Sequence, residues 1–246
     1  QGLPTGAVEY AVHEGNNFLS YSYEEGNSIE SALPEAAVSN TTYIFGESVS
    51  AAQINGEWVG TLQQVGFEGG RGYWFGATNN FEFEYNDPSA ALARFVPIAL
   101  PDVPVELAFK QSSQQYFYFV KEASIDGLDL SYGDWVVAYH NDVIIGSRHY
   151  NGSIFDIPIM KNDGQNYSAG YLPNGEVPTI KVHRTNGEIV EMHVTLVDGE
   201  LACEGTGFAV VTLSDENIPM EVTLHNAYPN PFNPTTVIEY ELSQGS

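Results

Sequence analysis

The sequence predicts an all-β fold with two β-sandwich-like domains of short antiparallel strands, and three observations lead to this prediction. The chain of 246 residues holds 24 Gly, 15 Tyr and 13 Phe but a total of only 8 Lys and Arg. Aromatic and β-branched residues interrupted by Gly and Asn favour strands over long helices. Short apolar runs recur at a spacing of roughly 8–12 residues, which is typical of sandwiches. Hairpin signals separate these runs at Asn55-Gly56, Asn141-Asp142 and Asn186-Gly187.

Residues 1–88 are expected to form the first β domain. Alternation at 8–12 and 18–23 predicts two strands around a turn at 15–17. The segment NSIESALPE predicts a short helix that Asn27 caps and Pro34 ends. Five further strands are predicted at 41–46, 50–54, 57–62, 72–77 and 81–85. In the last of these, Phe81, Phe83 and Tyr85 should point inward and Glu82 and Glu84 outward.

Four prolines fall within residues 86–105, and we interpret residues 89–105 as a linker or crossover between the domains. The second β-sandwich domain is expected over residues 106–224. Its predicted strands lie at 106–112, 115–120, 134–140, 142–150, 179–184, 189–197 and 207–213. Residues 225–246 then form a Pro-rich, extended segment that ends in a single strand.

The charge of the chain excludes two classes of partner. The formal net charge is −24, and contacts with nucleic acid or anionic lipid need clustered Lys and Arg. No stretch approaches the ~18 apolar residues of a membrane span, so no membrane insertion is expected. The acidity is consistent with solubility alone, with the binding of divalent cations, or with an extracellular setting at raised salt. The single cysteine, Cys203, is expected to be an inert core residue.

Catalytic motifs are not evident in the sequence. The six histidines lack metal-ligand spacing, although His183 and His193 should lie on opposite arms of one hairpin. There is no Gly-x-Ser-x-Gly motif, and no pair of carboxylates stands out in so acidic a chain. The chain is therefore predicted not to be an enzyme.

Calcium is the one cofactor that the sequence suggests. Asp126, Asp129 and Asp134 lie around one glycine-containing turn, and Asp163 lies in another. Hard cations bind several such oxygens on a turning backbone, but neither segment has EF-hand spacing. The alternative is that both segments are simply turns.

Carbohydrate binding would require exposed aromatic side chains with polar neighbours. The candidates are Trp74, Tyr73, Trp135, Arg148 and Tyr150, with Trp58, Tyr139 and His149 as further aromatic residues. The alternative is that the tryptophans, which alternate with core positions, are buried. Arg148 is notable because basic residues are scarce, and it is expected to pair with a nearby Asp.

The tail combines a stiff spacer with strand-forming residues. Pro229, Pro231 and Pro234 restrict φ and disfavour helix. The motif Tyr228, Pro229, Asn230, Pro231, Phe232, Asn233 and Pro234, followed by TTVIEYEL, closely resembles the opening of the C-terminal sorting domain of the type IX secretion system. The segments 46–75 and 132–183 resemble modules that precede such domains. This resemblance implies an extracellular protein, or one on the outer surface of a Gram-negative-type bacterium, that meets the secretion machinery.

The terminal strand also suggests assembly. Val237, Ile238, Tyr240 and Leu242 could add a strand to the sheet edge of a neighbouring molecule, and repetition of such a contact builds a fibre. We therefore expect a non-enzymatic structural or adhesive surface protein, with a filament subunit as one form of it. Its partners would be copies of itself, other surface proteins or glycans. The alternatives are a carbohydrate-binding module and, third, a fragment of an extracellular hydrolase.

Overall fold

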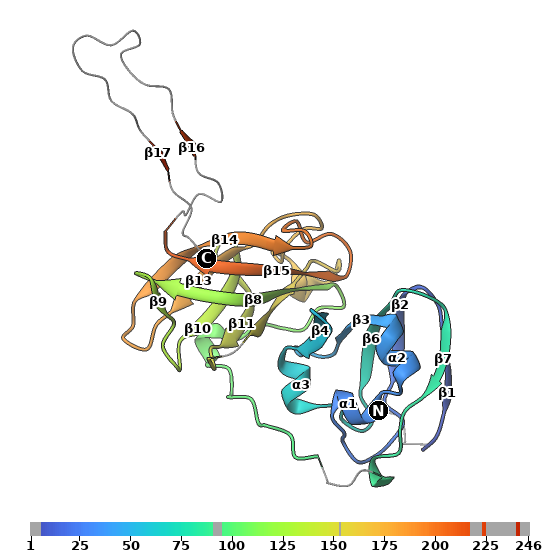
Figure 1. Cartoon of the computed structure of the whole chain (residues 1–246). Coiled ribbons are helices and arrows are strands. Elements are labelled where there is room, and N and C mark those ends of the chain that lie inside the picture. Colours follow the sequence, from blue (N-terminus) through green and yellow to red (C-terminus); the bar gives the residue numbers. More distant parts are fainter. Residues whose placement is uncertain (1–5, 91–94, 153, 217–222, 225–239, 242–246) are drawn as a thin grey trace, which may run out of the picture.

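The computed structural model describes residues 6–90, 95–152, 154–216, 223–224 and 240–241, and strands dominate it (Figure 1). The all-β class is confirmed. The described residues include three short α-helices, α1 (Ile29–Ala32), α2 (Glu35–Asn40) and α3 (Thr61–Val65). They also include the 3-10 turns η1 (Pro88–Ala90), η2 (Val105–Leu107) and η3 (Asn166–Ser168). Among the described residues, none of the helices has the length and apolar character that a membrane crossing requires.

The first domain contains a five-stranded antiparallel sheet in the order β2-β6-β3-β4-β5. Its strands are β2 (Gly15–Ser20), β3 (Thr41–Phe45), β4 (Ser50–Ile54), β5 (Glu57–Val59) and β6 (Gly72–Ala77). A separate two-stranded ribbon pairs β1 (Glu9–Val12) with β7 (Phe81–Glu84). The hairpin expected between the first two strands is wrong, because β1 pairs with β7 and residues 15–17 lie inside β2.

The helices of this domain were only partly predicted. The first begins after Ser28 rather than Asn27, because the Ser28 hydroxyl accepts the Ser31 N–H at 3.1 Å and caps α1. Pro34 does not only end this segment, since it also precedes α2 as its N-cap residue. The strand predicted at 57–62 is correct only in its first half, because the chain turns after β5 and begins α3. Gly60 makes this turn with a φ of 116°, and a Cβ there would lie 2.4 Å from the Ser50 carbonyl oxygen.

The central sheet of the first domain is buried on both faces. Ile44, Ala51 and Phe75 face the helices and the β1–β7 ribbon in one core. Their neighbours Phe45 and Ala52 belong to a second apolar cluster on the opposite face. Period-two alternation along the strands produces this division.

The predicted inward face of β7 is confirmed. Phe83 and Tyr85 are buried, Phe81 packs against the same core, and Glu82 and Glu84 are exposed.

The second domain has one continuous path of strands, in the order β11-β10-β13-β14-β15-β8-β12, with β9 paired to β8. The strands are β8 (Gln115–Ile125), β9 (Leu128–Asp129), β10 (Trp135–His140), β11 (Val143–His149), β12 (Phe155–Met160), β13 (Thr179–His183), β14 (Ile189–Asp198) and β15 (Gly207–Ser214). Strand β14 pairs first with β13 and then with β15. The two halves of the path enclose one large apolar core. Contrary to the expectation of antiparallel strands, β8 and β15 run parallel.

Two strand assignments in this domain need correction. The strand predicted at 106–112 is wrong, because η2 occupies its start and no strand is assigned over those described residues. Strand β12 was not predicted, because Pro158 interrupts its pattern of strand-forming residues. A proline is compatible with a strand at the end of a sheet, where its missing N–H breaks no ladder. Strand β12 occupies that position.

The two domains pack through an apolar contact between Phe45 of β3, Phe117 and Phe119 of β8, and Phe208 of β15. The rings of Phe45 and Phe117 lie 4.5 Å apart, and those of Phe119 and Phe208 lie 5.4 Å apart. Along β8 the tyrosines Tyr116 and Tyr118 point the other way, into the core of the second domain. One strand therefore contributes to two apolar clusters.

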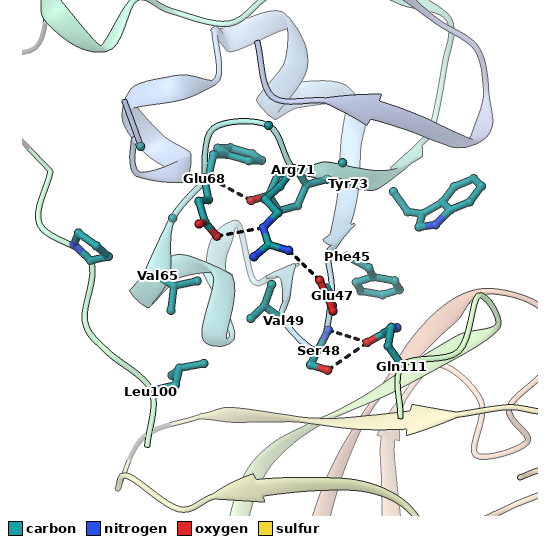
Figure 2. A pocket seen from close by; sticks show the side chains of 18 of the residues that line it. Phe45, Glu47, Ser48, Val49, Val65, Glu68, Arg71, Tyr73, Leu100 and Gln111 are labelled. Carbon is teal, nitrogen blue, oxygen red and sulfur yellow. Dashed lines mark hydrogen bonds and ion pairs between the residues drawn. The ribbon is translucent and has the colours of Figure 1, made fainter. Parts of the chain in front are cut away.

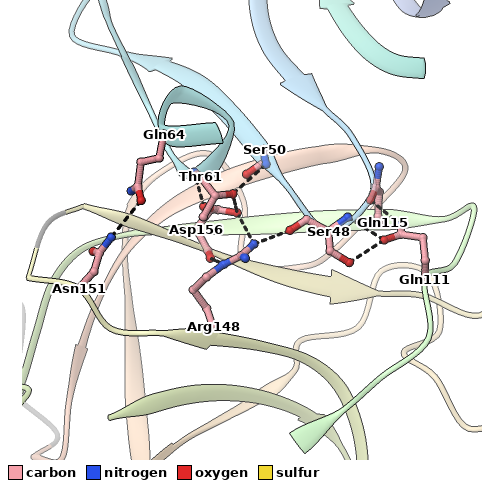
Figure 3. Close-up of polar contacts among 9 residues, drawn as sticks. All are labelled: Ser48, Ser50, Thr61, Gln64, Gln111, Gln115, Arg148, Asn151 and Asp156. Carbon is pink, nitrogen blue, oxygen red and sulfur yellow. Dashed lines mark hydrogen bonds and ion pairs between the residues drawn. The ribbon is translucent and has the colours of Figure 1, made fainter. Parts of the chain in front are cut away.

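A buried ion pair adds hydrogen bonds across this apolar contact (Figure 3). Asp156 of β12 is fully buried and accepts a hydrogen bond from Arg148 Nη2 at 2.8 Å. It also accepts the Thr61 backbone N–H at 2.7 Å and the Thr61 hydroxyl at 3.1 Å. Because Thr61 begins α3, a side chain of the second domain satisfies the first turn of a helix in the first domain. The expectation that Arg148 pairs with an aspartate is confirmed.

Removal of the Asp156 carboxylate should destabilise the whole molecule. Asp156→Ala leaves the buried Arg148 guanidinium without its anionic partner and the Thr61 N–H without its acceptor. Breaking a buried pair in this way costs about 3–5 kcal/mol. Urea unfolding followed by tryptophan fluorescence measures the loss. The control is Glu188→Ala, which removes a more exposed pair with Arg184 and should cost about 0–1 kcal/mol. Equal midpoints for the two variants would contradict the structural role of Asp156.

The close approach of β11 and β12 leads to a second prediction. A Cβ at Gly146 would lie 1.6 Å from the Pro158 carbonyl oxygen, which is a backbone atom and cannot simply rotate away. We expect Gly146→Ala to lower the free energy of unfolding by about 1–3 kcal/mol or more. The matched control is Gly207→Ala, whose Cβ would meet the Tyr116 side chain at 3.2 Å. A thermal midpoint for Gly146→Ala as high as that of the control would be incompatible with this packing.

Candidate functional site

A cleft of about 1330 Å³ lies at the junction of the domains (Figure 2). The first domain lines it with the turn between β3 and β4 and with residues 65–68 and 70–74. The linker contributes residues 95 and 97–100, and the approach to β8 contributes residues 111–113 and 115. Junctions between domains are common places for ligand sites, and those sites usually measure about 300–1,000 Å³. This cleft has room for an extended ligand.

A row of aromatic side chains crosses three neighbouring strands at this cleft. Phe18 of β2 stands opposite Trp74 of β6, which in turn stands opposite Phe45 of β3. The rings of Phe18 and Trp74 lie 5.0 Å apart at an angle of 50°. Phe45 is buried, Trp74 is half-buried and Phe18 is 62% exposed. The row therefore extends from the domain contact to solvent, and it presents apolar ring surface to the cleft.

Charged groups gather beside the aromatic row. Arg71 Nη1 lies 2.8 Å from a Glu47 carboxylate oxygen, and Arg71 Nε lies 3.2 Å from one of Glu68 (Figure 2). The Glu68 backbone N–H donates to the Tyr73 hydroxyl at 2.9 Å. Burial raises the pKa of Tyr73 to about 12, so its hydroxyl stays neutral at physiological pH. The cleft thus combines apolar rings with groups that can donate and accept hydrogen bonds.

Hydrogen bonds from the second domain fix the turn of the first domain that carries Glu47. Its neighbour Ser48 has a φ of 57°, which is uncommon for a residue other than glycine. The Gln111 side-chain oxygen accepts both the Ser48 N–H at 2.8 Å and the Ser48 hydroxyl at 3.0 Å. The Ser48 carbonyl accepts Arg148 Nη2 at 2.7 Å (Figure 3). The buried network at the interface therefore reaches the rim of the cleft, where it fixes a strained turn.

A smaller cavity of about 130 Å³ lies between the linker, α3 and the second domain. Trp135, His149 and Tyr132 line it together with Arg148. The rings of Trp135 and His149 lie 5.4 Å apart, edge to face. Linker residues 98–100 line both cavities, so the linker passes between them.

The structure divides the five predicted ligand residues among three places. Tyr73 and Trp74 line the large cleft, whereas Trp135 and Arg148 line the small cavity. Tyr150 packs edge-on against Phe155 at the margin of the second core. The predicted burial of a tryptophan is confirmed for Trp58, which is 7% exposed.

Sequence reasoning missed several residues of the large cleft, above all Phe18, Glu47, Glu68, Arg71 and Gln111. The scarcity of basic residues was the only available signal for Arg71. The other residues are far apart in the sequence and become neighbours through strand pairing and the domain contact.

The four aspartates suggested for calcium lie in three different places. Asp134 is buried and accepts the backbone N–H groups of Ser131 and Thr185, each at 2.9 Å. Hydrogen bonds from Ser168 and then Tyr167 hold the pKa of Asp163 well below its usual range. Asp126 lies in the turn between β8 and β9, and Asp129 lies in β9 opposite Ser124. Within the part of the chain that the structure describes, no group of three or more His, Cys, Asp or Glu side chains is arranged to hold a metal ion.

The two histidines expected on one hairpin do not face each other. His183 of β13 stands opposite Ile189, whereas His193 of β14 stands opposite Ser214 of β15. The Tyr139 hydroxyl lies 2.8 Å from His183 Nε2. Burial, followed by the charge of Lys181, lowers the pKa of His183.

Most of the predicted tail features lie outside the described residues. These are the sorting motif, residues 228–234, and Val237, Ile238 and Leu242 of the proposed assembly strand. Tyr240 is described, and β17 (Tyr240–Glu241) pairs antiparallel with β16 (Thr223–Leu224) of the same chain. Donation of this strand to another molecule stays a prediction.

The large cleft, with its aromatic row and the ion triad of Arg71, Glu47 and Glu68, is the strongest candidate site. Comparisons of the chain with protein-family models, with curated proteins and with solved structures gave no match.

Proposed function

We propose that this chain is a non-enzymatic, adhesive β protein of the cell exterior, and that its interdomain cleft binds a carbohydrate. The observation that carries the proposal is the aromatic row of Phe18 and Trp74 beside the ion triad of Arg71, Glu47 and Glu68. The resemblance of the tail to a type IX sorting signal supports the extracellular setting. The proposal unites adhesion and carbohydrate binding in one site.

Sugars are amphipathic, and the cleft offers both kinds of contact that they need. The C–H face of a pyranose ring packs on an aromatic ring, as the half-buried Trp74 and the exposed Phe18 allow. Hydroxyl groups pair with charged and amide side chains, and charge-assisted hydrogen bonds are the stronger ones. Glu47 and Glu68 are 65% and 69% exposed and can accept such bonds.

The site is preorganised for binding. Trp74 is fixed between Phe18 and Phe45 on paired strands. The turn that carries Glu47 is tied to the second domain through Ser48, Gln111 and Arg148. Groups that are already ordered in the free protein lose little conformational entropy when a ligand binds.

Truncation of Trp74 should strongly weaken glycan binding. Trp74→Ala removes the central ring of the aromatic row, and such anchors commonly contribute about 2 kcal/mol or more, which corresponds to a loss of roughly thirtyfold in affinity. Titration of the best array ligand by calorimetry measures this loss. Trp135→Ala is the matched control, because it truncates a tryptophan outside the large cleft and should leave the affinity unchanged.

Three results would contradict the proposal. Wild-type protein that binds no glycan on the array would remove the carbohydrate ligand, and Trp74→Ala with full affinity would remove this cleft. Circular dichroism must show that Trp74→Ala is folded before its affinity is compared with that of the wild type. Because paired carboxylates can also cleave glycosides, release of reducing sugar from the bound glycan would overturn the non-enzymatic part.

A further inference from the structure

We propose that the cleft selects uncharged glycans and rejects acidic ones, and that the ion triad of Glu47, Arg71 and Glu68 sets this selectivity. The inference rests on the proposed carbohydrate function and assigns the class of ligand. Arg71 is the residue in the cleft that would otherwise attract a carboxylate-bearing sugar.

The guanidinium of Arg71 is already engaged on two edges. Its Nη1 and Nε atoms each contact a carboxylate, at 2.8 Å and 3.2 Å. Arginine recognises carboxylates through such forked contacts. An acidic sugar would have to displace Glu47 or Glu68 before it could make the same contact.

The local charge also opposes an anion. The charged side chains among the described residues that line the cleft are Glu47, Glu68 and Arg71, so their formal sum is +1 − 2 = −1. The whole chain carries a formal charge of −24. A ligand with its own negative charge therefore approaches a site and a surface of like charge.

The triad is held in place from several sides. The Glu68 backbone N–H donates a hydrogen bond to the Tyr73 hydroxyl, and Glu68 lies three residues before Arg71 on the same turn. Glu47 is adjacent to Ser48, which Gln111 and Arg148 anchor from the second domain. Because both acids are attached to anchored backbone, their charges stay at the cleft when a ligand enters.

Matched pairs of glycans test the inference directly. The array should carry oligogalacturonates beside their carboxyl-reduced counterparts, and sialylated glycans beside the desialylated forms. Wild-type protein should prefer the uncharged member of each pair at least tenfold. Screening at 1 M salt, where the Debye length falls to about 3 Å, should narrow the preference.

A charge-reversing variant provides the second arm. Glu47→Gln with Glu68→Gln changes the formal sum at the cleft from −1 to +1 and leaves Arg71 without an anionic partner. This variant should gain at least tenfold in affinity for the acidic member of each pair. The control is Glu57→Gln with Glu82→Gln, which changes the net charge equally at exposed positions outside the cleft. It should keep the wild-type preference.

The outcomes separate the inference from the proposed function. Wild-type binding of acidic glycans that equals or exceeds binding of their uncharged partners would overturn the inference and leave carbohydrate binding intact. A double variant that folds but keeps the wild-type preference would overturn the role of the triad, and each single variant checks this result if the double variant does not fold. Absence of binding to either class would overturn both proposals.

Discussion

Burial of both faces of β8 is the constraint on which the rest of the structure depends. Its tyrosines, among them Tyr118, fill the core of the second domain, and its phenylalanines, among them Phe119, meet the sheet of the first domain. Consecutive side chains of a strand point to opposite faces, so one short segment can join two apolar clusters. Phe45 belongs to this contact and also lines the large cleft. The position of the cleft therefore follows from the packing of the domains.

The buried charges at the interface form directional hydrogen bonds, and these fix the geometry of an otherwise apolar contact. A carboxylate without solvent is costly unless it is paired and hydrogen-bonded, and Asp156 receives three such bonds from two elements that are distant in the sequence. Arg148 extends this network to the Ser48 carbonyl, and Ser48 adjoins Glu47 at the cleft. The path from the interior to the rim consists of direct contacts, so the geometry of the site depends on the geometry of the interface.

The cleft is rigid and places apolar rings beside charged groups, and this combination favours recognition of an amphipathic ligand. Trp74 lies between two aromatic neighbours on paired strands, and Arg71 lies between two acids. Neither group needs to be rearranged to receive a sugar ring. A binding role of this kind would suit the extracellular adhesive protein that we propose, which would hold a surface ligand without changing it.

Local patterns in the sequence determined the all-β class, most strand positions and the hairpins at Asn55, Asn141 and Asn186, because turn chemistry and period-two alternation act between near neighbours. They did not reveal the β12 strand, whose proline is tolerated through its place at the end of a sheet. They also did not reveal that β1 pairs with β7, because pairing partners far apart in the chain leave no local signature. The cleft was decided by tertiary structure alone, since Phe18, Glu47 and Gln111 meet there only after two domains have packed. Their individual residue types are ordinary, and it is the burial of Phe45, Phe117 and Asp156 at the interface that brings them together.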